Sequence, residues 1–151
     1  MKSLIQCSQT GLRSLFIVFV MVAFLSGTAL AENKADKNFA AVISDAKGVD
    51  TELKNLRFYW EEKISETAFV PHELKQVPVK RGAATIHVKF ETIKQIDVTP
   101  EADKALPVLT ITLTNGKTGE FMLGIAGSLK GESDFGEVEL PANGVKKIVF
   151  K

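Results

Sequence analysis

The stretch Val108–Lys117 has the sequence VLTITLTNGK, and it decides the fold class. Its apolar residues alternate with threonines, which is the two-residue period of a strand with one buried face. Asn115-Gly116 follows this alternation directly. Asn-Gly is the strongest short signal of a β-hairpin, because both residues tolerate the positive φ angle that a type I′ turn requires. The stretch therefore predicts a strand, a tight turn and a return strand over residues 120–126.

The same alternation recurs along most of the chain after residue 38. We expect further strands at Ala41–Ile43, Val77–Val79, Thr85–Phe90, Ile93–Val98, Phe135–Leu140 and Val145–Phe150. Together these segments predict an all-β fold of about seven or eight antiparallel strands. A small β-sandwich and a closed barrel bury the same residues, so both architectures remain open. Lys146 and Lys147 predict that the last strand lies at an exposed edge of the sheet.

Two parts of the chain, about 41–98 and 108–150, resemble each other. The matched residues are Ile43, Gly48 and Glu52 with Ile111, Gly116 and Glu120, then Val88 and Phe90 with Val138 and Leu140, and Ile93–Ile96 with Val145–Ile148 after a two-residue insertion. Self-similarity of this kind predicts two pseudo-repeated units of about four strands each. The alternative is that any two β-hairpins share alternation and turn glycines.

The stretch Leu53–Ile64 is compatible with two kinds of secondary structure. Leu53, Leu56, Trp60 and Ile64 would share one face of a helix. Arg57-Phe58-Tyr59-Trp60 instead has strong strand propensity. We predict a strand, in which Phe58 and Trp60 point to one side while Arg57 and Tyr59 point to the other.

Residues 1–31 follow the order of a secretory signal peptide. Basic residues precede the apolar run Leu15–Leu25, and the small residues Ala29 and Ala31 occupy the positions that a signal peptidase must accept. The apolar run is short, because a membrane-spanning helix needs about 20 such residues. We therefore predict cleavage after Ala31 and a periplasmic or secreted product, with an uncleaved anchor as the alternative.

The product of that cleavage would be a flexible lead, 32–38, followed by a single β domain, 39–151. The only cysteine, Cys7, precedes the predicted cleavage point. The exported product would therefore contain no disulfide and no thiolate metal site, and we predict no cofactor. The chain has 19 basic and 18 acidic residues. This balance argues against a nucleic-acid partner, and we expect membrane contact only during export.

Arg57, Tyr59 and Trp60 form a candidate binding site. They include the only tyrosine and the only tryptophan of the chain. Aromatic residues and arginine are enriched where protein partners dock. The alternative for Trp60 is a place in the hydrophobic core, whereas Arg57 and Tyr59 would lie on the opposite, exposed face.

Glu132, Asp134 and Glu137 form a candidate metal site. Their carboxylates are the hard oxygen ligands that Ca²⁺ accepts, although their spacing does not match an EF-hand loop. A solvated acidic turn is the alternative. The histidines, His72 and His87, have no second ligand at metal-binding spacing, so we expect both at the surface.

The predicted function is that of a non-catalytic binding or accessory module, which contacts another exported or envelope protein. No arrangement typical of a nucleophilic or metal-dependent enzyme stands in the sequence. One alternative is a hydrolase of envelope polymers that uses the carboxylates of Glu61, Glu62 and Glu66. Another is a barrel that carries a small apolar ligand inside. The pattern predicts no oligomeric state.

Overall fold

The computed structural model describes residues 37–151 of the chain. The predicted signal peptide, its cleavage at Ala29 and Ala31 and most of the predicted flexible lead lie outside the described residues. The strands are β1 (Ala41–Asp45), β2 (Asp50–Lys63), β3 (Phe69–Leu74), β4 (Gln76–Arg81), β5 (Ala84–Lys89), β6 (Ile93–Thr99), β7 (Val108–Leu113), β8 (Thr118–Leu123), β9 (Ser128–Ser133), β10 (Gly136–Pro141) and β11 (Val145–Phe150), and two 3-10 turns are η1 (Phe90–Thr92) and η2 (Ala142–Gly144).

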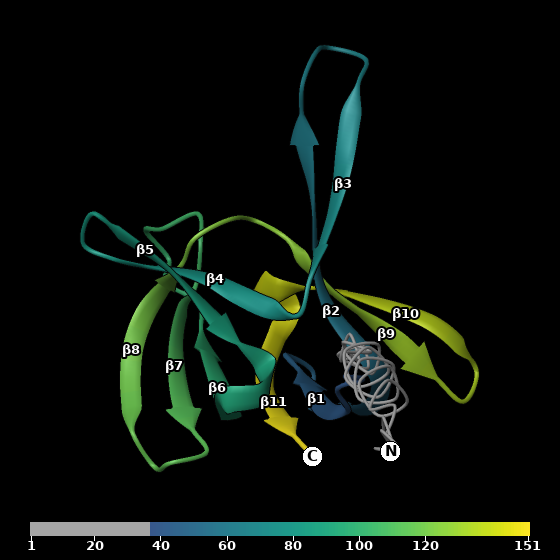
Figure 1. Ribbon diagram of the computed structural model, residues 1–151, viewed down its shortest axis with the longest axis vertical. Helices are drawn as coiled ribbons and strands as arrows, with labels where there is room; N and C mark the ends of the chain where they lie inside the picture. The colour runs from purple at the N-terminus through teal and green to yellow at the C-terminus, as the bar shows by residue number, and fades with distance from the viewer. Residues whose placement is uncertain (1–36) are drawn as a thin grey trace, which may run out of the picture. The chain divides into compact units, whose positions relative to one another are not determined.

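The strands form one antiparallel sheet in the order β10-β9-β2-β1-β11-β6-β7-β8-β4-β5, and β3 pairs with β2 beside this path (Figure 1). The prediction of an all-β antiparallel fold is confirmed. The sheet has 11 strands, more than the sequence predicted, and it is not closed. Its apolar side chains from both halves meet around one core, so the arrangement is sandwich-like.

The return strand predicted over residues 120–126 is confirmed as β8, although it begins at Thr118 and ends at Leu123. The chain leaves β8 after Leu123 and begins β9, a strand that the sequence did not predict, at Ser128. A Cβ atom on Gly127 would lie only 2.5 Å from the Tyr59 carbonyl oxygen, and one on Gly124 would lie 3.1 Å from the Pro78 oxygen. The two glycines therefore let the chain cross close to β2 and β4 and change partners.

The prediction that the last strand lies at an edge is wrong. Strand β11 is central, because it pairs with β1 on one side and with β6 on the other. Val145 and Ile148 are buried, whereas Lys146 is exposed. Lys146 therefore marks the solvent-facing side of a central strand, a pattern that resembles edge protection when only the sequence is known. The strands with a free edge are β3, β5 and β10.

Strand β2 confirms the prediction of a strand in the ambiguous stretch and explains its helix-like spacing. Asn55 has a φ angle of 52°, and the pairing of β2 with β9 shifts between Lys54 and Arg57. Such a β-bulge inserts one residue and so reverses the alternation of side chains. Leu53 and Leu56 consequently both point into the core, where each is fully buried.

The two parts of the chain that look alike occupy equivalent places in the sheet. Each strand of the first part has a counterpart in the second: β1 and β7, β2 and β8, β4 and β9, β5 and β10, β6 and β11. When every strand is replaced by its counterpart, the strand order of the sheet reads the same from the opposite end. At the centre of the sheet, Ile96 of β6 pairs with its counterpart Ile148 of β11. The turn glycines Gly48 and Gly116 also agree, with φ angles of 82° and 85°. That both parts descend from one duplicated unit stays a prediction.

The 3-10 turns correct the alignment of the two parts. When η1 is superposed on η2, Val88 corresponds to Leu140 and Phe90 to Ala142. The sequence match had paired Val88 and Phe90 with residues two positions earlier. The two-residue insertion is therefore unnecessary, because one offset of 52 residues covers β4 to β6 and β9 to β11.

One segment has no counterpart in the second part. The turn residue Gly48 and its counterpart Gly116 are 68 positions apart in the chain, whereas residues of β4 to β6 and their counterparts are 52 positions apart. The first part therefore contains 16 additional residues between this turn and β4. The extra length forms the outer half of β2, a turn and β3. We call residues 61–74 the arm. Figure 1 shows it projecting from the sheet as an isolated two-stranded hairpin.

Candidate functional site

The root of the arm is held by contacts on both of its faces. On one face, Arg57 Nη1 donates to Glu73 Oε2 at 2.6 Å, which joins β2 to β3. On the same face, the ammonium group of Lys130 in β9 lies 3.4 Å from the centre of the Tyr59 ring. The Tyr59 hydroxyl donates to Glu61 Oε1 at 2.5 Å. Predicted binding residues Arg57 and Tyr59 therefore lie together, but their polar groups already have partners within the chain.

These contacts also change the acidity of the tyrosine. The hydrogen bond to Glu61 is the main cause that raises the pKa of Tyr59 to about 12, with burial and the nearby carboxylates adding to it. Both the donated hydrogen bond and the neighbouring negative charge favour the neutral phenol. Tyr59 therefore acts as a hydrogen-bond donor at neutral pH and is not a candidate base.

Trp60 lies at the root of the arm, on the face opposite to Arg57 and Tyr59. Its ring stacks on His72 of β3, with centroids 4.7 Å apart and planes 13° from parallel. His72 Nε2 lies 3.0 Å from Glu62 Oε2. Trp60 is half-buried and packs against the edge of the core, next to Phe58. The structure therefore does not bring Trp60 to the face of Arg57 and Tyr59, and it gives the indole a packing role at the root.

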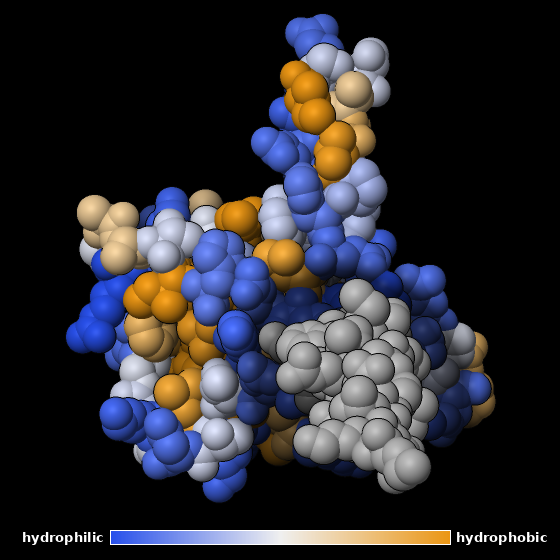
Figure 2. Space-filling model, in the orientation of Figure 1, coloured by the Kyte–Doolittle hydropathy of each residue, from blue (hydrophilic) through white to orange (hydrophobic). Residues whose placement is uncertain are grey.

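The tip of the arm exposes apolar side chains. Ile64, Phe69 and Val70 are 65%, 54% and 37% exposed. The backbone N–H of Ile64 donates to the Ala68 carbonyl oxygen, which closes the turn. Hydrophobic side chains are visible along the arm, far from the rest of the hydrophobic surface (Figure 2). We name Ile64, Phe69 and Val70 the tip cluster, in which Phe69 and Val70 are consecutive in β3 and therefore lie on opposite faces of the hairpin.

Sequence reasoning missed the tip cluster. In the structure the sign of the arm is the length of β2, which has 14 residues against 6 in its counterpart β8. The length of β2 was not visible, however, because no local pattern marks where a strand leaves the sheet.

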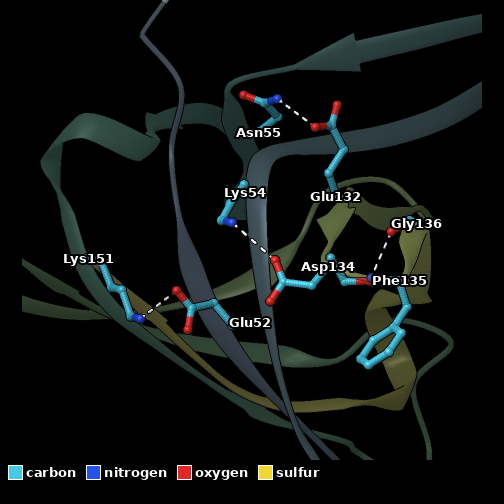
Figure 3. A network of polar contacts seen from close by, with 9 residues as sticks. Glu52, Lys54, Asn55, Glu132, Asp134, Phe135, Gly136 and Lys151 are labelled. Carbon is cyan, nitrogen blue, oxygen red and sulfur yellow. Dashed lines mark hydrogen bonds and ion pairs between the residues drawn. The ribbon is translucent and has the colours of Figure 1, made fainter.

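Two of the three predicted calcium ligands have partners elsewhere in the chain. Figure 3 shows Glu132 accepting from the Asn55 amide at 3.1 Å and Asp134 accepting from Lys54 at 3.2 Å. Glu137 stands opposite Glu132 in the β9–β10 pair. Between residues 37 and 151, no three acidic, histidine or cysteine side chains are arranged to hold a metal ion. At the turn itself, Phe135 is fully exposed.

The carboxylates considered for hydrolysis lie on different faces. Glu61 and Glu62 are consecutive in β2, so their side chains point to opposite sides of the hairpin. Glu61 contacts Tyr59 and Glu62 contacts His72, whereas Glu66 belongs to the turn. This geometry does not form the facing pair that glycoside hydrolysis uses.

The core offers little room for an internal ligand. A cavity between Phe58, Val77 and Ile148 has a volume of about 20 Å³. A single water needs roughly 10–15 Å³ of such space, so no small apolar molecule fits in this cavity. His87 lies exposed on β5, in agreement with the surface position expected for it.

Comparison with known proteins places the chain in one family. It belongs to the family described as "Uncharacterised protein", whose model matches residues 35–151. No curated protein and no solved structure matches the chain significantly. Within residues 37–151, no helix is long and apolar enough to cross a membrane. The functional argument therefore rests on the arm and the surfaces around it.

Proposed function

We propose that this protein is an exported, non-catalytic docking module of the cell envelope, and that it binds another protein through the tip of the arm. Support for export comes from the order of basic, apolar and small residues in 1–31. Support for docking comes from the arm, which is an addition to one of two otherwise equivalent parts of the sheet.

The observation that carries the proposal is the exposure of the tip cluster on a hairpin that is rigid at its root. Phe69 and Ile64 are more than half exposed, whereas the large apolar side chains of the core are almost completely buried. Exposed aromatic and aliphatic side chains become strong contacts when a partner covers them. The Arg57–Glu73 pair and the stacked Trp60 and His72 fix the direction of the arm, which lowers the entropy that docking costs.

Site-specific crosslinking tests the docking surface. A photoreactive amino acid in place of Glu66, at the tip, should give a defined crosslinked product in the exported fraction of the native cell. The same amino acid in place of Lys47, in the β1–β2 turn, is the control, because that turn is exposed but lies in the sheet itself. Products of equal yield at both positions, or none at either, would contradict docking through the arm.

Two single substitutions sharpen the test. Phe69→Ser should abolish the Glu66 crosslink, since it removes the aromatic side chain of the tip cluster. Phe135→Ser is the matched control, because Phe135 is a fully exposed phenylalanine at another hairpin turn. If only Phe135→Ser removes the product, the docking surface is the β9–β10 turn and the proposal for the arm fails.

The export step has a separate test. N-terminal sequencing of the protein from the exported fraction should give Glu32 as the first residue. A product that begins at Met1 would show that residues 1–31 are retained.

A further inference from the structure

An apolar groove lies between β5 and the β7–β8 hairpin. Its volume is about 460 Å³, within the range of roughly 300–1,000 Å³ that is usual for binding pockets. The apolar lining residues are Ile86, Val88, Ile111, Leu113 and Phe121. Figure 2 shows hydrophobic side chains gathered over this part of the sheet, with hydrophilic side chains around them.

The rim of this groove is cationic. Arg81, Lys89 and Lys117 line it, together with His87, and no acidic residue does so within the described chain. Arg81 lies over the Phe121 ring, 6.0 Å from its centre. Among residues 37–151, none of these three cations forms an ion pair. The groove therefore suits an occupant that is apolar and carries negative charge.

The arm has this chemistry. It combines the tip cluster with Glu61, Glu62, Glu66 and Glu73, against the single basic residue Lys63. Residues 37–151 contain 16 basic and 16 acidic residues. The arm holds one of the basic residues and four of the acidic residues. The arm is thus net −3 and the rest of the described domain net +3, with histidines neutral. Complementary charge of this kind guides and orients association.

We propose that the partner of the arm is a second copy of this chain, whose groove receives the tip cluster; this inference rests on the proposed docking function. Glu62 and Glu66 of the arm then face Lys89 and Lys117 of the groove. The arm cannot fill its own groove, because it leaves the sheet at β2 and points away from β5, β7 and β8 (Figure 1). The contact is head-to-tail, so it builds open chains or closed rings of copies.

Charge exchange between the two surfaces tests this assembly. Sedimentation of the wild-type protein should show a mean mass that rises with protein concentration and falls as sodium chloride is added. The groove variant Lys89→Glu/Lys117→Glu and the arm variant Glu62→Lys/Glu66→Lys should each associate at least about tenfold more weakly, because like charges then face each other. An equal mixture of both variants should associate again, since every contact in it joins opposite charges.

The control is Lys94→Glu/Lys146→Glu, which reverses two exposed lysines of β6 and β11 outside the groove. It should associate like the wild type. Circular dichroism of all variants checks that they are folded. Renewed association in the mixture of the two charge variants requires that both docking surfaces are still folded.

Three outcomes would overturn the inference. The wild type could remain monomeric at about 1 mM, the concentration that corresponds to weak affinity. Both charge variants could associate as well as the wild type. The groove of a monomeric protein could bind decanoate, which would assign it to small anionic amphiphiles.

The result also separates this inference from the proposed function. A Glu66 crosslink to a different protein, with a monomeric wild type, would reject the second copy and leave docking through the arm intact. A crosslinked product of twice the chain mass would support both.

Discussion

Tyr59 illustrates what single residues could and could not reveal. The sequence predicted that Arg57 and Tyr59 share a face of a strand, and they do. It could not reveal that Glu73 and Lys130 occupy that face from two neighbouring strands, because the register between strands is set by distant residues. A pair of residues that looked available for a partner is therefore already engaged.

The phenol of Tyr59 should titrate unusually late. We expect absorbance at the tyrosinate wavelength to rise with a midpoint near pH 12, because hydrogen bonding to Glu61 and nearby carboxylates raise the pKa of Tyr59 to about 12. Glu61→Gln should lower this midpoint toward the ordinary value of about 10, since it removes the negative charge. Tyr59 is the only tyrosine, so the titration reports one group.

The same shift has a consequence for stability. A pKa that is raised on folding adds stability that is fully present below pH 10 and is lost as the pH rises through about 12. Glu61→Gln should therefore weaken the fall of the unfolding free energy in that pH range. A midpoint near pH 10 for both proteins would show that the contact with Glu61 does not form.

At the level of elements, alternation and turn residues predicted where most strands lie in the sequence. They did not predict which strands lie side by side in the sheet. The strand over Val108–Leu113, the turn at Asn115-Gly116 and the strand in Leu53–Ile64 are confirmed, but only Gly116 of the two turn residues has a positive φ angle, so the turn is not type I′. The edge position of the last strand was wrong, and strands β3 and β9 were not predicted. Alternation reports which side of a strand is buried, and says nothing of which strand lies beside it.

Gly127 should tolerate no side chain. Gly127→Ala places a Cβ atom 2.5 Å from the Tyr59 oxygen and 2.6 Å from the Phe58 ring, and it should destabilise the protein by about 1–3 kcal/mol. Gly144→Ala is the control, because no atom lies within 4 Å of its added Cβ. Urea unfolding measures both. Equal losses at the two glycines would mean that the crossing between β8 and β9 is not tight.

The arm should be dispensable for folding. Replacing residues 62–70 by Asn-Gly, so that Glu61 joins Pro71 through a tight turn, removes exposed side chains and leaves the root contacts of Arg57 and Trp60 in place. We expect the unfolding free energy to change by less than about 1 kcal/mol, as is usual for changes at the surface. Loss of cooperative urea unfolding would show that the arm stabilises the sheet.

For the whole molecule, the decisive feature is the exchange of strands between the two parts. Strand β6 of the first part pairs only with β11 and β7, which both belong to the second. Likewise β2 pairs with β9, and β4 pairs with β8. The sequence predicted two related units, each with its strands paired among themselves. Internal similarity does not reveal whether a strand pairs within its own unit or with the other one.

The centre of the sheet should be more sensitive to substitution than its outer face. Ile148→Ala, in β11, removes a buried side chain that pairs with Ile96, and it should cost about 2–5 kcal/mol. Val149→Ala, at the next position, is the control, because Val149 is exposed and should cost less than about 1 kcal/mol. Similar losses for both would place β11 outside the core.

The exchange of strands also orders events during synthesis. A ribosome releases β1 to β6 first, yet β6 cannot find a neighbour until β7 follows, and the gap between β1 and β6 stays empty until β11 is made. The sheet therefore closes its middle only when β11, the last of its strands in chain order, has been synthesised. Folding this late would suit the export proposed above, because a chain that has not yet folded can still pass through a narrow channel.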